Sequence, residues 1–164
     1  MIKQLLTLAA LTFSLSASAQ THPLWMRYSA ISPDGSTIAF SYKGDIYTVP
    51  VGGGNARQLT SNAAYDAYPV WSPDGQNIAF ASTREGSMDI YLMNRNGGAP
   101  KRLTTDSGDE YPQTFRDNTH ILFSANGMPT QKSIIFAGGS FPQVYEVGTN
   151  GGAGGRSLSS ALLH

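Results

Sequence analysis

A nine-residue segment occurs twice in this chain, and the repeat constrains the fold more than any other feature. Ser32–Phe40 reads SPDGSTIAF, and Ser72–Phe80, which lies 40 residues later, reads SPDGQNIAF. Two shorter motifs, Asp-Ile-Tyr and a basic residue followed by x-Leu-Thr, each return after 44 residues, at 45–47 and 89–91 and at 57–60 and 101–104. Self-similarity at a period of about 40–45 residues, with four short strands in each unit, is typical of the blades of a β-propeller.

The second unit indicates how one repeat forms one blade. In its first turn Pro73 fixes φ, Asp74 can bond its own backbone, and Gly75 can adopt a positive φ. The segment Ile78–Ser82 is apolar without alternation, which is typical of a strand covered on both faces. Pro100 and the basic residues after it discourage edge-to-edge pairing, as an outer strand requires. The unit predicts a four-stranded antiparallel meander with strands at 68–72, 78–82, 89–93 and 100–104.

The third unit departs from this pattern. Asn118 stands where the first two units have a turn glycine, and because Asn also tolerates a positive φ, we expect a similar turn there. Tyr145 follows Tyr91 by 54 residues, so extra residues fall between 125 and 142, where Ser133–Phe136 is either an added strand or a loop. The predicted fold class is all-β, an incomplete β-propeller of about three four-stranded antiparallel blades at about 27–60, 67–104 and 110–159.

The N-terminus has the pattern of a secretory signal peptide, which we predict at residues 1–19. Lys3 supplies a positive charge, Leu5–Leu15 is apolar but too short to span a bilayer, and Ala17–Ala19 is a small-x-small cleavage site. An uncleaved anchor or a buried helix is the alternative. Because the sequence contains no cysteine, it has no site for a lipid anchor on cysteine. We therefore expect residues 20–164 to be exported as a partial β-propeller with no membrane anchor after cleavage.

Charge and residue types argue against several functions. The net charge is +0, so we expect no nucleic-acid partner, which would call for a basic surface. The histidines of the chain are His22, His120 and His164. The sequence contains neither a Gly-x-Ser-x-Gly motif nor a His-Glu-x-x-His motif beside them. Cysteine ligands for zinc are absent from the sequence. We therefore predict no catalytic, cofactor-binding or metal-binding residue and no cofactor.

Several side chains recur at equivalent positions, and each has a structural interpretation beside a functional one. A carboxylate in the first turn could hold a metal, but hydrogen bonding within the turn explains it at both positions, Asp34 and Asp74. A carboxylate that opens the third strand is expected at a strand edge, bonded to a neighbouring loop, at Asp45 and Asp89. The recurring tyrosines are expected to pack between blades rather than to bind a ligand, at Tyr47, Tyr91 and Tyr145. Trp71 is expected to do the same, since its counterpart Ile31 is apolar.

The Ser-Pro-Asp-Gly turn, the Asp-Ile-Tyr strand and the closing basic-x-Leu-Thr motif resemble the WD40-like repeats of bacterial propellers, which occur in TolB and in tricorn-like proteases. The segment from Leu24 to Tyr47 is most similar to the N-terminal propeller of secreted tricorn-like peptidases of family S41. This resemblance covers about residues 24–152. It implies a periplasmic or extracellular location in a bacterium and a role in gating peptides or binding proteins. It also implies that the serine nucleophile lies in other domains, so no catalytic residue is carried over.

About three blades are fewer than the 4–8 of a closed propeller, so the chain is expected to form an open arc with two uncovered blade faces. Three interpretations follow. The chain is a catalytically silent portion of a larger exported peptidase, whose further blades and catalytic domains are its partners. Alternatively, it is a TolB-like protein-interaction module that completes its ring by association with another copy or another protein. The third interpretation, an enzyme in its own right, lacks the required catalytic groups.

Overall fold

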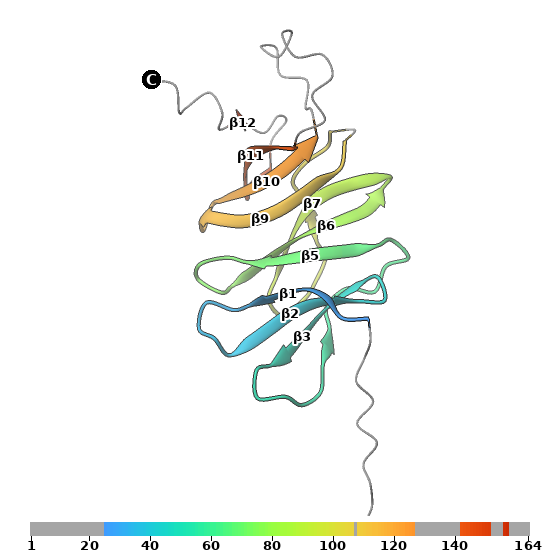
Figure 1. The fold of residues 1–164 in the computed structure, drawn as a ribbon, viewed down its shortest axis with the longest axis vertical. Helices are drawn as coiled ribbons and strands as arrows, with labels where there is room; N and C mark the ends of the chain where they lie inside the picture. Colours follow the sequence, from blue (N-terminus) through green and yellow to red (C-terminus); the bar gives the residue numbers. More distant parts are fainter. Residues whose placement is uncertain (1–24, 107, 127–141, 152–155, 158–164) are drawn as a thin grey trace, which may run out of the picture.

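The computed structural model describes residues 25–106, 108–126, 142–151 and 156–157, which form twelve β-strands. The strands make three four-stranded antiparallel sheets, each built from consecutive strands, and the sheets stack as blades of an open arc (Figure 1). This arrangement confirms the predicted fold class. The predicted signal peptide, His22, His164 and Ser133–Phe136 lie outside the described residues. Within the described part of the chain, no helix is long and apolar enough to cross a membrane.

Each sheet is a meander in which chain order and spatial order agree. The first sheet contains β1 (Arg27–Ile31), β2 (Thr37–Tyr42), β3 (Asp45–Pro50) and β4 (Arg57–Gln58). The second contains β5 (Asp66–Trp71), β6 (Asn77–Glu85), β7 (Ser87–Asn94) and β8 (Lys101–Arg102). The third contains β9 (Glu110–Asp117), β10 (His120–Asn126), β11 (Pro142–Gly148) and β12 (Arg156–Ser157).

The last strand of each sheet is shorter than the repeat pattern suggests. In the second sheet the prediction covered 100–104, but only Lys101–Arg102 pair with β7. The chain leaves the ladder because Leu103 turns into the core, where it is 2% exposed. Its amide still donates to the Ile90 carbonyl at 2.8 Å, and the Thr104 hydroxyl accepts the Ile90 amide at 2.9 Å. These two bonds fasten the end of the blade to its third strand.

The aspartate of the repeated turn closes the first hairpin of each of the first two sheets. The Ser72 hydroxyl donates to Asp74 Oδ1 at 2.6 Å, and the Gln76 amide donates to the same oxygen at 2.9 Å. The hydrogen bond from Ser72 is the main cause that lowers the pKa of Asp74, and matching bonds lower the pKa of Asp34 to about 2. Gly75 has a φ of 65°, as the turn requires.

The third sheet forms its first hairpin differently, and the expectation of a positive φ at Asn118 is wrong. Asp117 pairs directly with His120, so this turn is shorter than the other two. The Asp117 carboxylate accepts the Thr119 amide at 2.8 Å, as the earlier turn aspartates do. Asn118 Oδ1 instead accepts the Asp74 amide at 3.0 Å. Asn118 thus serves as a link to the neighbouring sheet rather than as a left-handed turn residue.

Alternating side chains give every sheet two faces, and the core lies between successive sheets. One cluster joins the first and second sheets: Ala39, Ile46, Trp71, Ile78, Phe80, Tyr91 and Met93. Another joins the second and third sheets: Ala79, Ile90, Leu103, Phe115, Ile121, Phe123, Ala125, Tyr145 and Val147. In both, small and aliphatic residues of the earlier sheet meet large residues of the later sheet. Trp71, Tyr91 and Tyr145 therefore pack between blades, as predicted.

A Phe–Tyr pair crosses the two central strands of every sheet. The ring centroids lie 5.8, 5.9 and 5.6 Å apart in Phe40–Tyr47, Phe80–Tyr91 and Phe123–Tyr145. Such cross-strand aromatic pairs stabilise a sheet face beyond the area they bury. Tyr47 differs from its two counterparts, because it is only half-buried, on the face of the first sheet that is turned away from the second. The prediction that Tyr47 packs between blades is not met by the described residues.

The first strands of the three sheets converge at the inner edge of the arc. β1 lies against β5, and β5 lies against β9 (Figure 1). The Trp71 indole donates to the Ala30 carbonyl at 3.1 Å, and the Asp66 amide donates to the Gly44 carbonyl at 2.8 Å. Both bonds join the first sheet to the second. The inner strands therefore form a wall whose side chains keep fixed positions relative to one another.

Buried carboxylates lie near the starts of strands at both junctions. Asp66 accepts a hydrogen bond from Arg84 Nη2 at 2.6 Å. Asp89 was expected at a strand edge but is fully buried, and its Oδ2 lies 2.9 Å from Arg102 Nη2 without hydrogen-bond alignment. Glu110 is also fully buried. Burial is the main cause that raises the pKa of Glu110 to about 7, and burial also raises the pKa of Asp89.

The turn at Gly75 yields a first prediction. In Gly75→Val, a β-branched residue would occupy a backbone with a φ of 65°, so we expect the free energy of unfolding to fall by about 1–3 kcal/mol. Urea unfolding of the two chains measures the difference. Gly52→Val is the matched control, because Gly52 has no positive φ and a Cβ atom added there would meet nothing within 4 Å. Equal losses in both variants would contradict the turn assignment.

The buried Glu110 yields a second prediction, concerning pH. The folded chain holds this proton up to about pH 7, whereas the unfolded chain releases it near the ordinary pKa of 4.5. The free energy of unfolding should therefore fall as pH rises from about 5 to about 7, by about 3 kcal/mol, and level off above. Asp89 acts in the same direction. Urea unfolding at several pH values measures the slope.

Glu110→Gln should remove most of that slope and raise stability above neutral pH. The control is Glu85→Gln, which changes an exposed carboxylate and should leave the slope in place. A slope that survives in Glu110→Gln would mean that another group is responsible.

Candidate binding site on the inner strands

One tyrosine on the inner strand of each sheet contributes to a continuous set of rings, the tyrosine row: Tyr28 of β1, Tyr68 of β5 and Tyr111 of β9. The ring centroids of Tyr28 and Tyr68 are 3.8 Å apart, and those of Tyr68 and Tyr111 are 5.0 Å apart in an edge-on arrangement. The Tyr68 hydroxyl donates to the Tyr28 hydroxyl at 3.1 Å. The row therefore crosses all three sheets at the inner wall.

Two tyrosines of the row sit on strained backbone. The φ angle is 53° at Tyr28 and 58° at Tyr68, a region that bulky residues rarely adopt. Around both residues the register with the next strand shifts, as at a β-bulge. A bulge changes the direction in which a side chain points, and backbone strain of this kind is concentrated at ligand-binding sites. These features favour a role of the tyrosine row in binding over a role in packing alone.

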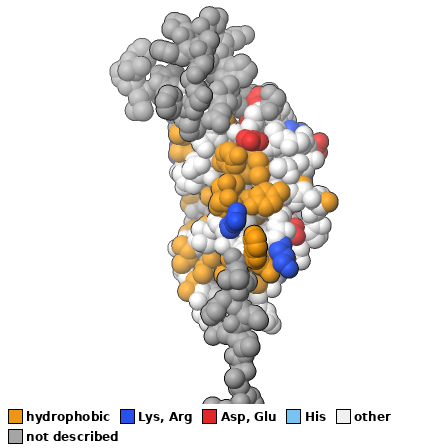
Figure 2. Space-filling view, turned by 45° about the vertical axis from the view of Figure 1, so that its right-hand side comes forward, with side chains coloured by type: hydrophobic (Ala, Val, Ile, Leu, Met, Phe, Trp, Pro, Cys, Tyr) orange, Lys and Arg blue, Asp and Glu red, His pale blue; other side chains and the backbone are white. Residues whose placement is uncertain are grey.

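Two tyrosines of the row, Tyr68 and Tyr111, have raised pKa values. The hydrogen bond to Tyr28, followed by burial, raises the pKa of Tyr68 to about 12. Burial is the main cause that raises the pKa of Tyr111. Neutral phenols present an apolar ring and a hydroxyl that can donate or accept. Figure 2 shows hydrophobic side chains in a band across the stacked sheets, with Lys or Arg side chains beside it.

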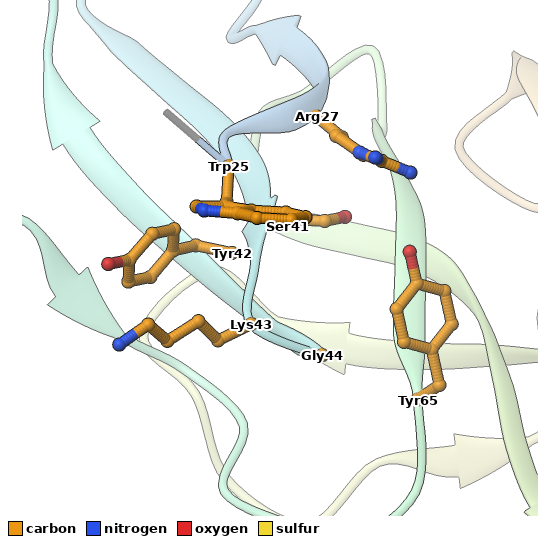
Figure 3. A pocket seen from close by; sticks show the side chains of 7 residues that line it. All are labelled: Trp25, Arg27, Ser41, Tyr42, Lys43, Gly44 and Tyr65. Atoms are coloured by element: carbon orange, nitrogen blue, oxygen red, sulfur yellow. The ribbon is translucent and has the colours of Figure 1, made fainter. Parts of the chain in front are cut away.

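A cleft of about 340 Å³ opens beside β1 and the β2–β3 turn. Its lining residues are Trp25, Arg27, Ser41, Tyr42, Lys43, Gly44 and Tyr65. Figure 3 shows the Trp25 indole in the middle, with Arg27 and Tyr65 on one side and Tyr42 and Lys43 on the other. Trp25 and Tyr65 are 63% and 39% exposed, so two aromatic surfaces face solvent. The Tyr65 amide donates to the Thr83 hydroxyl at 3.0 Å, which holds the backbone of Tyr65 in place at the side of the cleft.

The floor of the cleft holds an unused polar group. Ser41 is 3% exposed, and its hydroxyl has no hydrogen-bond partner among the described residues. A buried hydroxyl without a partner is costly, and the Ser41 oxygen itself lies below the surface of the cleft. Lys43 has a φ of 51° at the tight turn before Gly44, which places a cation at the rim. The cleft thus combines aromatic walls and two cations above a buried hydroxyl.

The residues singled out from sequence lie elsewhere. Asp34 and Asp74 are occupied within their turns by the hydrogen bonds of the Ser-Pro-Asp-Gly motif. His120 opens β10, where its Nδ1 lies 3.0 Å from Asp117 Oδ1 and 2.9 Å from the Thr119 hydroxyl. Asp45 accepts hydrogen bonds from Gln58 and Thr60, and so braces its own sheet. In the described ranges, no three His, Cys, Asp or Glu side chains are placed to hold a metal ion.

Comparison with known proteins assigns the family. The description of the tricorn protease N-terminal β-propeller domain matches residues 23–158. The chain belongs to this family. Tricorn protease homolog 1 of Streptomyces coelicolor is 33% identical over 82 residues, which are 50% of this chain and 8% of that protein. The tricorn-type propeller described here therefore spans a small part of the length of that relative.

Two solved structures share the blade arrangement. A protein described as TolB from Agrobacterium tumefaciens superposes with a TM-score of 0.68 at 23% identity, over 84% of this chain and 50% of that one. TolB from Acinetobacter baumannii superposes with a TM-score of 0.62 at 26% identity, over 81% of this chain and 32% of that one. The tricorn-type propeller thus corresponds to half or less of each of these chains.

Sequence reasoning did not find the inner-strand site. The recurrence of a tyrosine near the start of each first strand, at Tyr28, Tyr68 and Tyr111, is the signal that the sequence offers for it. A left-handed backbone at a tyrosine contradicts local preference. The cleft joins Trp25 to Tyr65, residues 40 positions apart. That contact depends on how two blades stack.

The strained tyrosine yields a third prediction. Tyr68→Asn and Tyr68→Val both remove the ring, but Asn tolerates a left-handed backbone and Val does not. We expect the free energy of unfolding of the Val variant to be about 1 kcal/mol or more below that of the Asn variant. Urea unfolding provides the comparison. At Tyr111, which has no positive φ, the Val and Asn variants should not show this difference in free energy of unfolding. An equal difference at both sites would contradict backbone strain at Tyr68.

Proposed function

We propose that this chain is the non-catalytic propeller portion of an exported tricorn-like serine peptidase of family S41, and that it binds extended peptide or protein segments. The match of the tricorn propeller description to residues 23–158 supports this proposal. Residues 1–19 act as the signal peptide, and residues 20–164 form the exported part, in the periplasm or outside the cell. The further blades and catalytic domains of a longer protein are the partners of this portion.

The inner-strand site supports peptide binding in particular. The tyrosine row offers a series of flat rings, on which the side chains of an extended peptide can stack. In the cleft beside β1, Arg27 and Lys43 favour an acidic group beside aromatic walls. Guanidinium groups hold carboxylates through charge-assisted hydrogen bonds. The single observation that carries the proposal is the cleft beside β1, where Arg27 and Lys43 lie with the exposed rings of Trp25 and Tyr65.

A second candidate is a TolB-like protein-interaction module. The TolB structure from Acinetobacter baumannii, at 26% identity and over 81% of this chain, favours this alternative. In that role the same inner wall would bind a folded protein or its terminal segment. The two candidates share a binding propeller without catalysis, and they differ in whether the rest of the ring belongs to a peptidase.

Peptide binding yields the fourth prediction. A fluorescein-labelled, unstructured peptide rich in glutamate and tyrosine should bind the full chain, and its counterpart with lysine in place of glutamate should bind at least about tenfold more weakly. Arg27→Gln should weaken binding of the acidic peptide by about tenfold, because one charge-assisted hydrogen bond contributes about 1.5–3 kcal/mol. Fluorescence anisotropy measures both affinities.

The controls separate the cleft from general charge. Arg27→Lys should restore part of the affinity, because it keeps the cation. Arg95→Gln should have little effect, because Arg95 lies over the Trp71 ring, outside this cleft. Equal binding of the acidic and basic peptides, or equal losses in Arg27→Gln and Arg95→Gln, would refute binding at the cleft.

A further inference from the structure

A second cleft lies at the junction of the first and second sheets, and its volume is about 270 Å³. Thr37, at the start of β2, lines this cleft, whereas Tyr42, at the end of the same strand, lines the cleft that contains Trp25. The two clefts therefore lie at opposite ends of β2. We call the second one the arginine cleft, after Arg57 and Arg95, which line it.

The arginine cleft holds two positive charges without a countercharge. Arg57 belongs to β4 of the first sheet, and Arg95 directly follows β7 of the second. In the part of the chain that the structure describes, neither guanidinium forms an ion pair with a carboxylate. None of the described residues that line the cleft is acidic. The cleft is therefore an electropositive site on a chain whose net charge is +0.

Each guanidinium is held in place by a neutral group. Arg57 Nη2 donates to the Asn96 carbonyl. The Arg95 guanidinium lies over the Trp71 ring, 5.7 Å from its centroid, an arrangement that attracts the cation to the ring face. Trp71 is only 8% exposed, so its ring is a fixed support. Because neither a carbonyl nor an indole neutralises the charge, both cations stay available to a ligand, and less order is lost when it binds.

One carboxylate lies near enough to act on Arg95 at a distance. The hydrogen bond from Ser32 is the main cause that lowers the pKa of Asp34, and Arg95 contributes least to that shift. Asp34 Oδ1 accepts bonds from the hydroxyls of Ser32 and Ser36, so the turn already uses this carboxylate. Asp34 therefore does not neutralise the arginine cleft.

The chemistry of the arginine cleft fits a phosphate group. Two guanidinium groups match a ligand that carries about two negative charges, as a phosphate monoester does at pH 7. The planar fork of arginine donates two parallel hydrogen bonds to phosphate oxygens. Thr37 and Thr48 add hydroxyls to the lining, and Val49 adds an apolar wall. A volume of about 270 Å³ suits a small molecule rather than a long polymer segment.

We propose that the arginine cleft binds a doubly charged phosphate group between Arg57 and Arg95, either as the free ion or as the monoester of a small molecule. The site joins the fourth strand of one sheet to the third strand of the next, so a bound phosphate would bridge the two sheets. Because the arginine cleft lies at the other end of β2 from the peptide cleft, the inference does not depend on the proposed function.

Isothermal titration calorimetry of the full chain tests the proposal with two probes, inorganic phosphate and phenyl phosphate. We expect saturable one-to-one binding of phenyl phosphate, at least about tenfold tighter than binding of succinate, whose two carboxylates lie apart. A second readout uses the two tryptophans of the chain. In Trp25→Phe only Trp71 remains, and its fluorescence should change with the same dissociation constant, because Arg95 lies over its ring.

Arg57→Gln and Arg95→Gln should each weaken phenyl phosphate binding by about tenfold or more, because each removes one charge-assisted contact. Arg95→Lys should lose part of that affinity, since it keeps the cation without the fork. The matched control is Arg116→Gln, which removes a cation from the third sheet, where Arg116 pairs with Asp117 and Glu146. It should leave binding unchanged. Circular dichroism and thermal unfolding confirm that each variant is folded.

The two probes distinguish the source of the phosphate. Tighter binding of phenyl phosphate than of inorganic phosphate supports a small organic phosphate, and equal binding of both supports the free ion. Three results would overturn the proposal: no saturable binding of either probe, equal affinity in Arg57→Gln, Arg95→Gln and Arg116→Gln, or binding of succinate as tight as that of the phosphate probes.

Discussion

The structure depends on the contact between successive sheets, in which large side chains of one sheet pack on small and aliphatic side chains of the sheet before it. A four-stranded sheet of this size cannot shield both of its faces alone, and burying apolar area contributes about 25 cal/mol per Å². Phe80 and Tyr91 are buried in one cluster with Ala39 and Ile46 of the first sheet. The alanine allows close approach, and the aromatic pair fills the space. Stability therefore belongs to the junctions more than to the individual blades.

Much of this fold follows from local sequence. The Ser-Pro-Asp-Gly turn, the apolar second strand and the Asp-Ile-Tyr strand each specify a local structure, and the repeat places them in equivalent sheets. Asn118 shows where this reasoning stops. Its local chemistry favours a left-handed turn, but a hydrogen bond to the Asp74 amide of the neighbouring sheet uses its side chain instead. Asp89 likewise reads as a strand-edge residue and becomes a buried one through stacking.

The candidate site was less predictable than the fold, because it lies where separate repeats meet. Tyr28 and Tyr68 adopt backbone angles that their side chains disfavour, and no local rule places a tyrosine there. Ser41 belongs to a strand that sequence describes as core, and only the structure leaves its hydroxyl unpaired among the described residues. The tyrosines of the row do recur in every sheet, but the cleft is lined by residues that come together only through stacking, Trp25 and Tyr65.

The indole of Trp71 has a consequence for the shape of the arc. Apolar contacts alone allow one sheet to slide over the next, since a contact with one methyl group is nearly equivalent to a contact with its neighbour. The hydrogen bond from Trp71 to the Ala30 carbonyl forms only at one relative position of the two sheets, so it fixes the second sheet relative to the first. Phe115 takes the equivalent place in the third sheet and has no such donor. The second junction is held instead by the Asp74 amide, which donates to Asn118 Oδ1, so the pitch of the arc is set at both junctions, by two different hydrogen bonds.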